Sequence, residues 1–167
     1  MSNDEYYTPD WFLNLVVELQ GEIWLDPYSS PLKRTPAKLH YTKENPYPAP
    51  YFLTRTFCNP PYSKPNMPIV VEKFIESYRN GMQHSSLLCN ASTSSNWFQE
   101  MASNFPFVLL HTRVKFVEYI DGRLKGSSSP RYDNAFFYTG EDKERFVELF
   151  GNKGVIVLST TRIKGEK

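Results

Sequence analysis

The stretch LTRTFCNPPY, residues 53–62, joins an apolar segment to a turn that carries two adjacent prolines. The segment Leu53 to Cys58 predicts a buried strand, and residues 59–62 follow it directly. They would lie at the carboxyl end of that strand, which is where ligands bind in open α/β sheets. Each proline lacks a backbone N–H and fixes φ near about −65°. The turn is therefore stiff, and it presents carbonyl oxygens rather than donors.

A turn of this kind suits chemistry on a planar amino group. An aromatic amine is a poor nucleophile because its lone pair is delocalised into the ring. The side-chain oxygen of Asn59 and the carbonyl of Pro60 can each accept one amine hydrogen, which would localise the lone pair and stabilise the developing positive charge. Tyr62 offers a ring on which a flipped-out base can stack. The alternatives are a strand end without chemistry and a Pro-Pro-Tyr ligand for another protein.

Two weaker motifs precede this turn. Asp26 to Ser30 follows a predicted strand, Glu22 to Leu25, and an acidic residue there can hold the ammonium or hydroxyl groups of a cofactor. The alternative is an ordinary Asp-Pro turn. Near the amino terminus, Thr8 and Pro9 predict the start of a helix over residues 8–20, with Thr8 as its cap and Pro9 in its first turn.

Composition excludes several classes of protein. The 167 residues are 40% hydrophobic and 22% charged, which predicts one folded domain rather than a disordered chain. The net charge of +1 excludes a polybasic binder but permits a local basic patch. Cys58 and Cys89 lie in apolar runs and are expected to be buried free thiols, and no Cys or His spacing predicts a metal site. No segment has the roughly 20 apolar residues that span a bilayer.

The secondary-structure pattern favours an α/β layered sheet with an antiparallel edge. The Asp121-Gly122 pair predicts a hairpin, and residues 126–130 predict a flexible Gly/Ser loop. Residues 27–52 predict an irregular loop region with a short helical piece near Ala37. We expect further helices at 68–80, 96–104 and 141–150, and further strands at 85–89, 106–110, 114–119, 135–138 and 155–159.

The order of these motifs resembles the phage-type DNA N-6-adenine methyltransferase (Dam-like) family. The resemblance is carried by Thr8-Pro9, by Asp26-Pro27-Tyr28-Ser29-Ser30-Pro31, and by Asn59-Pro60-Pro61-Tyr62-Ser63. Shorter segments extend it over roughly residues 4–140: Tyr41 to Glu44, Trp97-Phe98, Arg113 to Phe116, Gly126 to Pro130, and Asn134 to Tyr138.

The resemblance implies a reduced Rossmann-like fold with a mixed sheet and an antiparallel edge hairpin, formed by a single methyltransferase domain over residues 1–167. It implies transfer of a methyl group from S-adenosylmethionine to the exocyclic amino group of adenine in DNA, without a metal. Such an enzyme would be encoded by a phage or prophage and act in the cytoplasm of a bacterial host. The residues carried over are Thr8, Pro9, Asp26, Pro27, Ser29 and Glu44 for the cofactor, and Asn59, Pro60, Pro61 and Tyr62 for catalysis.

The predicted DNA surface consists of loops, because no separate recognition domain is visible. Residues 113–139 form the predicted hairpin and loop region, with basic residues that can contact phosphates. A solvated hairpin, its charge offset by Glu118, Asp121 and Asp133, is the alternative. Trp97 is expected in the core or a lid rather than as a base wedge. The nucleic-acid candidates are Ser63, Lys64, Asn66, Arg113, Lys115, Arg123, Lys125 and Arg131, with Lys33, Arg34 and Lys38 as a second patch.

Two departures from the family pattern leave rival functions open. The loop after Asp26 has no glycine, and the interval from Asp26 to Asn59 is too short for two strand–helix units of ~30 residues each. One or both units must be shortened or lost. The same acceptor geometry also suits an RNA base or a protein glutamine amide, and a catalytically degenerate nucleic-acid-binding protein of the same fold is a further alternative.

Overall fold

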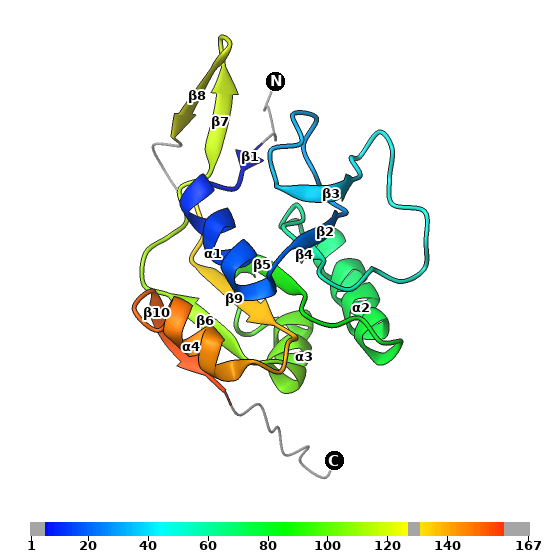
Figure 1. The fold of residues 1–167 in the computed structure, drawn as a ribbon, viewed down its shortest axis with the longest axis vertical. Helices are drawn as coiled ribbons and strands as arrows, with labels where there is room; N and C mark the ends of the chain where they lie inside the picture. The colour runs from blue at the N-terminus through cyan, green and yellow to red at the C-terminus, as the bar shows by residue number, and fades with distance from the viewer. Residues whose placement is uncertain (1–5, 127–130, 159–167) are drawn as a thin grey trace.

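The structure is a computed structural model that describes residues 6–126 and 131–158 (Figure 1). The predicted Gly/Ser loop, at residues 127–130, lies outside the described residues. The helices are α1 (Asp10–Gln20), α2 (Asn66–Arg79), α3 (Asn96–Asn104) and α4 (Lys143–Phe150). The strands are β1 (Tyr6–Tyr7), β2 (Ile23–Asp26), β3 (Ala37–His40), β4 (Phe57–Cys58), β5 (Ser86–Asn90), β6 (Phe107–Leu110), β7 (Val117–Ile120), β8 (Arg123–Gly126), β9 (Asn134–Tyr138) and β10 (Gly154–Val157).

A mixed sheet forms the centre of the molecule, with strand order β10-β6-β9-β5-β4. Strands β4 and β5 are parallel, whereas β9 is antiparallel to both β5 and β6, and β10 is antiparallel to β6. A parallel bridge between Leu25 and Thr56 joins β4 to β2, which pairs in parallel with β3. The fold class predicted from sequence, a mixed α/β sheet with an antiparallel edge, is confirmed.

Helices cover both faces of this sheet because successive side chains of its strands point to opposite sides. Leu87 and Phe137 face the cluster that contains α2 and α3, whereas Leu88 and Phe136 face the cluster that contains α1 and α4. The ring of Phe136 stacks on Phe150 of α4 with centroids 4.8 Å apart. Each such fully buried side chain stabilises the fold by about 1.5–3 kcal/mol relative to exposure. Both cysteines are buried and free, as predicted.

The predicted hairpin is confirmed as β7 and β8, which extend away from the sheet (Figure 1). Asp121 and Gly122 both have positive φ, 50° and 76°, as a two-residue type I′ turn requires. Strand β1 pairs with β7, with Tyr7 opposite Val117. The base of the hairpin is therefore hydrogen-bonded to the segment that leads directly into Thr8.

Three local predictions are wrong. The helical piece expected near Ala37 is strand β3, which forms because it pairs with β2. Only residues 57–58 of the strand expected over Leu53 to Cys58 belong to β4. The cap of α1 is Pro9 rather than Thr8, and no side-chain hydrogen bond caps the helix. The Thr8 hydroxyl has a long-range partner instead.

Candidate active site

The candidate site lies where two neighbouring parallel strands end. Asp26 is the last residue of β2, and Asn59 directly follows β4. From β2 the chain first adds β3 on one side and later β4 on the other, so the strand order reverses between β2 and β4. Such a switch point separates the loops that leave the strand ends and opens a crevice for ligands. The Leu25–Thr56 bridge makes these two strands neighbours.

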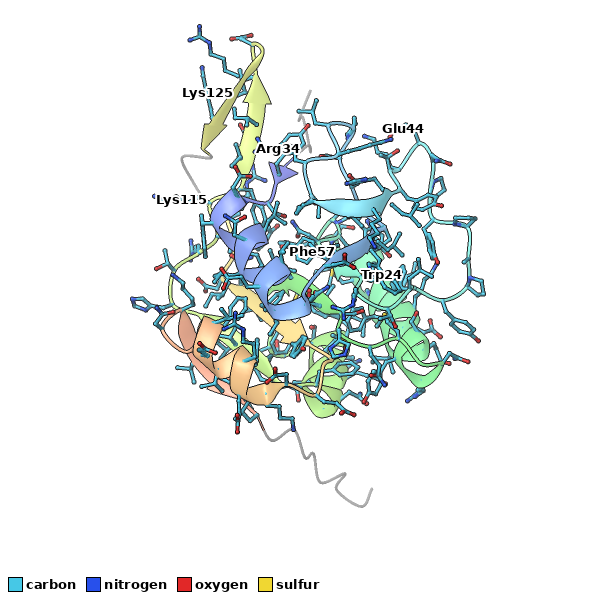
Figure 2. All side chains as sticks on the ribbon, viewed as in Figure 1. Trp24, Arg34, Glu44, Phe57, Lys115 and Lys125 are labelled. Carbon is cyan, nitrogen blue, oxygen red and sulfur yellow. The ribbon has the colours of Figure 1, made fainter. Side chains whose placement is uncertain are left out.

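A small pocket lies at this position, with a cavity volume of about 30 Å³ and about 320 Å³ when the open space at its mouth is included. Figure 2 shows two of its lining residues, Phe57 near the sheet and Arg34 nearer to β1 and the start of α1. The complete lining consists of Tyr7, Thr8, Leu13, Asp26, Tyr28, Ser30, Arg34, Thr35, Phe57 and Asn59.

Asp26 is a buried carboxyl group, with 4% of its surface exposed. Burial raises its pKa from the ordinary 3.8 to about 6, although hydrogen bonds from the Thr35 side chain and the Tyr28 backbone and attraction to His40 act in the opposite direction. The Tyr28 N–H donates to Asp26 Oδ1 over 3.1 Å. At pH 7.5 the group is mostly ionised, and it presents a desolvated negative charge to the pocket.

Asn59 is held at both ends of its side-chain amide. Its Nδ2 donates to Thr8 Oγ1 over 2.8 Å, and its Oδ1 accepts from the Tyr62 hydroxyl over 2.8 Å. The amide nitrogen therefore faces Thr8, and the amide oxygen faces Tyr62. An amide oxygen has two lone pairs, and the bond from Tyr62 leaves one available for a further donor.

The rest of the turn is divided between the interior and the surface. Pro60 is buried, Pro61 is exposed and Tyr62 is half-buried. The Tyr62 ring packs edge-on against Phe116 and Tyr132, with centroids 6.2 and 6.1 Å away. Burial raises the pKa of Tyr62 well above its usual value, so its hydroxyl stays a neutral donor.

The other predicted cofactor residues are not among the residues that line the pocket. Pro9, Pro27 and Ser29 are buried beside it, and the Ser29 N–H donates to the Tyr41 carbonyl. Glu44 is exposed on the loop that follows β3 (Figure 2) and forms an ion pair with Lys43 at 3.8 Å.

Sequence reasoning missed several lining residues, most notably the pair Arg34 and Thr35. The sequence predicts Arg34 as part of a nucleic-acid patch, and Thr35 belongs to no motif. The sequence signal that could have identified them is their position in the segment between β2 and β3, which starts at the carboxyl end of β2.

The nucleic-acid candidates are exposed and spread over three regions. Ser63, Lys64 and Asn66 follow the turn of residues 59–62, and the Ser63 carbonyl accepts from the first turn of α2. Arg123 and Lys125 lie on β8, and Lys115 lies below the hairpin (Figure 2). Arg113 follows β6 and pairs with Asp133 at 2.8 Å. Arg131 is exposed and precedes β9.

The second patch and Trp97 have separate positions. Lys33 and Lys38 are exposed, and Lys38 pairs with Glu22 at 3.3 Å. Trp97 is partly buried against the core cluster of α2 and α3, as expected for a core position. Within the described residues, no helix is long and apolar enough to cross a membrane, and no three His, Cys, Asp or Glu side chains are grouped to hold a metal.

A family model described as DNA N-6-adenine-methyltransferase (Dam) matches residues 1–144, which include every lining residue of the pocket. No curated protein and no solved structure matches the chain significantly. The family's reaction is methylation of adenine in DNA at the N6 amino group, which agrees with an acceptor-rich turn beside a pocket and does not favour the RNA-base and glutamine alternatives. The chain belongs to the DNA N-6-adenine-methyltransferase family and is an adenine-specific DNA methyltransferase.

Proposed function

We propose that this methyltransferase uses S-adenosylmethionine as its methyl donor and binds it in the pocket between Asp26 and Asn59. The observation that supports the proposal best is that one pocket is lined by both residues, which stand at the ends of neighbouring strands. A donor in this pocket would lie beside the turn that receives the target amine. Methyl transfer then depends mainly on positioning the two reactants.

The lining of the pocket fits a nucleoside that carries an amino acid. Asp26 offers a buried carboxylate for an ammonium or hydroxyl group, and Thr8 and Ser30 offer hydroxyls. Tyr28 and Phe57 offer apolar rings, and pockets with a few polar groups among rings are typical of cofactor sites. S-adenosylmethionine would supply an electrophilic methyl group on a positively charged sulfur.

The strand order also supports a reduced Rossmann-like fold for residues 1–167. Helices lie on both faces, the parallel strands β3, β2, β4 and β5 are adjacent, and the order reverses at the proposed cofactor site. The reduction is visible between β2 and β4, where the chain forms one strand, β3, and no helix.

Asn59 and Pro60 would act directly on the adenine amino group. The free lone pair of Asn59 Oδ1 and the Pro60 carbonyl would each accept one amine hydrogen, which concentrates the nitrogen lone pair for attack on the methyl carbon. The donor would supply its methyl group by cleavage of the carbon–sulfur bond as the C–N bond forms, and the methylated nitrogen would then release one proton to solvent. Tyr62 would hold Asn59 through its hydroxyl and border the flipped base with its ring.

The hairpin would bring DNA to this site. Arg123 and Lys125 are exposed on β8, where they can contact phosphates. Pairing of β1 with β7 attaches the base of the hairpin to the segment that carries Thr8. Bound DNA would thus be held by a surface that is connected through the backbone to the pocket.

The test is incubation with labelled S-adenosylmethionine and mixed DNA, followed by nucleoside analysis. We expect label in N6-methyldeoxyadenosine only. Asn59→Ala should abolish labelling while calorimetry still detects cofactor binding, and Asn104→Ala, which changes an exposed asparagine on α3, should have no effect. Cofactor binding without any transfer by the unmodified protein would instead establish the degenerate alternative. Near-normal labelling by Asn59→Ala would contradict the proposed role of the turn.

A further inference from the structure

Arg34 occupies an unusual position for an arginine of a surface loop. It lies between β2 and β3, and its side chain lines the pocket together with Asp26 and Asn59. The guanidinium is held by Asp10, the first residue of α1, because its Nη2 donates to Asp10 Oδ1 over 2.9 Å. One end of the guanidinium is therefore fixed outside the pocket by an ion pair.

The other end of the guanidinium has no acceptor. Arg34 Nη1 is buried and has no hydrogen-bond partner among the described residues. A guanidinium carries five N–H donors, and burying a donor without a partner is unfavourable. A buried donor without an acceptor, on a residue that lines the pocket, indicates that a ligand atom completes the site.

The ion pair of Arg34 is with Asp10 and not with Asp26. The groups that act on the pKa of Asp26, besides burial, are Thr35, Tyr28 and His40, so the two opposite charges of the pocket do not pair with each other. The pocket therefore presents a carboxylate and a guanidinium separately. An α-amino acid group carries an ammonium and a carboxylate on one carbon atom, and it complements this arrangement.

We infer that Arg34 binds the carboxylate of the methionyl group of S-adenosylmethionine, with Asp10 holding the guanidinium in position. The inference rests on the proposed cofactor. It moves Arg34 from the predicted nucleic-acid patch into the cofactor site, whereas Lys33 and Lys38 stay exposed to solvent. A guanidinium binds a carboxylate through charge-assisted hydrogen bonds, which are about twice as strong as neutral ones.

The test compares two ligands by calorimetry without turnover. S-adenosylhomocysteine carries the ammonium and the carboxylate, and 5′-(3-aminopropylthio)-5′-deoxyadenosine carries only the ammonium. The unmodified protein should bind the first ligand about 10- to 100-fold more tightly, as expected for a hydrogen bond between charged groups. Arg34→Gln should bind both ligands with similar affinity, because only the carboxylate-bearing ligand loses a contact.

Arg79→Gln is the matched control, because Arg79 pairs with Glu76 at 2.7 Å outside the pocket. It should keep the full preference for S-adenosylhomocysteine. Equal affinity of the unmodified protein for the two ligands would overturn the inference, whether or not the Arg34 variant folds. An equal loss of affinity for both ligands in Arg34→Gln would assign the residue a structural role. If the unmodified protein binds neither ligand, the proposed cofactor itself is refuted, and the role of Arg34 with it.

Discussion

Replacing Asp26 by Asn should make the ligand-free protein more stable at neutral pH. Asp26 is almost fully buried, and burial is the main reason why its pKa rises from 3.8 to about 6. The folded chain therefore binds the Asp26 proton more tightly than the unfolded chain does. Stability from this group is fully present below pH 3.8 and is lost as the pH rises through about 6. The pKa difference corresponds to about 3 kcal/mol at 25 °C.

Asn keeps the shape of Asp26 and removes the charge. Its side-chain oxygen can still accept from the Tyr28 N–H, and its amide can donate to the Thr35 hydroxyl. We expect Asp26→Asn to exceed the unmodified protein in free energy of unfolding by up to about 3 kcal/mol at pH 7.5. The advantage should shrink steadily and disappear near pH 4.

Urea denaturation followed by tryptophan fluorescence between pH 4 and 7.5 measures this difference directly, since Trp24 lies on β2 beside Asp26. Taking the difference between variants cancels the other titrating groups. Glu22→Gln is the control. Glu22 is fully exposed, and its hydrogen bonds with Trp24 and Lys38 lower its pKa, so this variant should gain nothing at pH 7.5. An advantage for Asp26→Asn that does not vary with pH would refute the argument from burial.

The other predictions concern the two partners of Asn59 and the hairpin. Thr8→Val removes the acceptor for Asn59 Nδ2, so kcat should fall about 10- to 100-fold while KM for DNA stays nearly unchanged. Thr8→Ser keeps the hydroxyl and should restore kcat. An equal loss of kcat in Thr8→Ser would contradict the hydrogen-bond role. Tyr62→Phe should lower kcat about tenfold, measured by methyl incorporation, because it removes only the hydroxyl. Tyr62→Ala should lower kcat further, because it also removes the ring. Identical losses would show that the ring contributes nothing beyond the hydroxyl. Replacing Arg123 and Lys125 by Gln should reduce the slope of log affinity for DNA against log salt by about 2, without changing cofactor binding by calorimetry; an unchanged slope would exclude the hairpin from phosphate contact.

Features that depend on neighbouring residues could be predicted from the sequence. The bounds of α3 at Asn96–Asn104 agree with the prediction because Ser95 caps the helix locally by accepting from the Phe98 N–H. The hairpin turn is equally local, since Asp121 and Gly122 both tolerate positive φ. The stiffness of the Pro-Pro turn also follows from its residues alone.

Features that depend on distant partners could not be predicted. Thr8 has the sequence signature of a helix cap, but its hydroxyl accepts from Asn59, which is 51 positions away. Residues 37–40 have weak periodicity, and Leu39 is 44% exposed, so their strand conformation comes from pairing with β2 rather than from a buried face. The buried donor of Arg34 is likewise visible only when α1 and the β2–β3 crossover are both in place.

The shortened crossover gives a physical reason why the loop after Asp26 carries no glycine. Strands β2 and β3 are parallel, so residues 27–36 must return from the carboxyl end of β2 to the amino end of β3. A helix usually makes this return and covers the face of the sheet. Here a segment of turns without a helix makes it, and the side chains of Arg34 and Thr35 line the pocket. Glycines in a cofactor loop let the backbone approach the ligand closely. A close approach of the backbone is not needed where side chains on a short crossover bind the ligand. Charged and hydroxyl side chains of the crossover can therefore replace the backbone contacts of a longer Gly-rich loop.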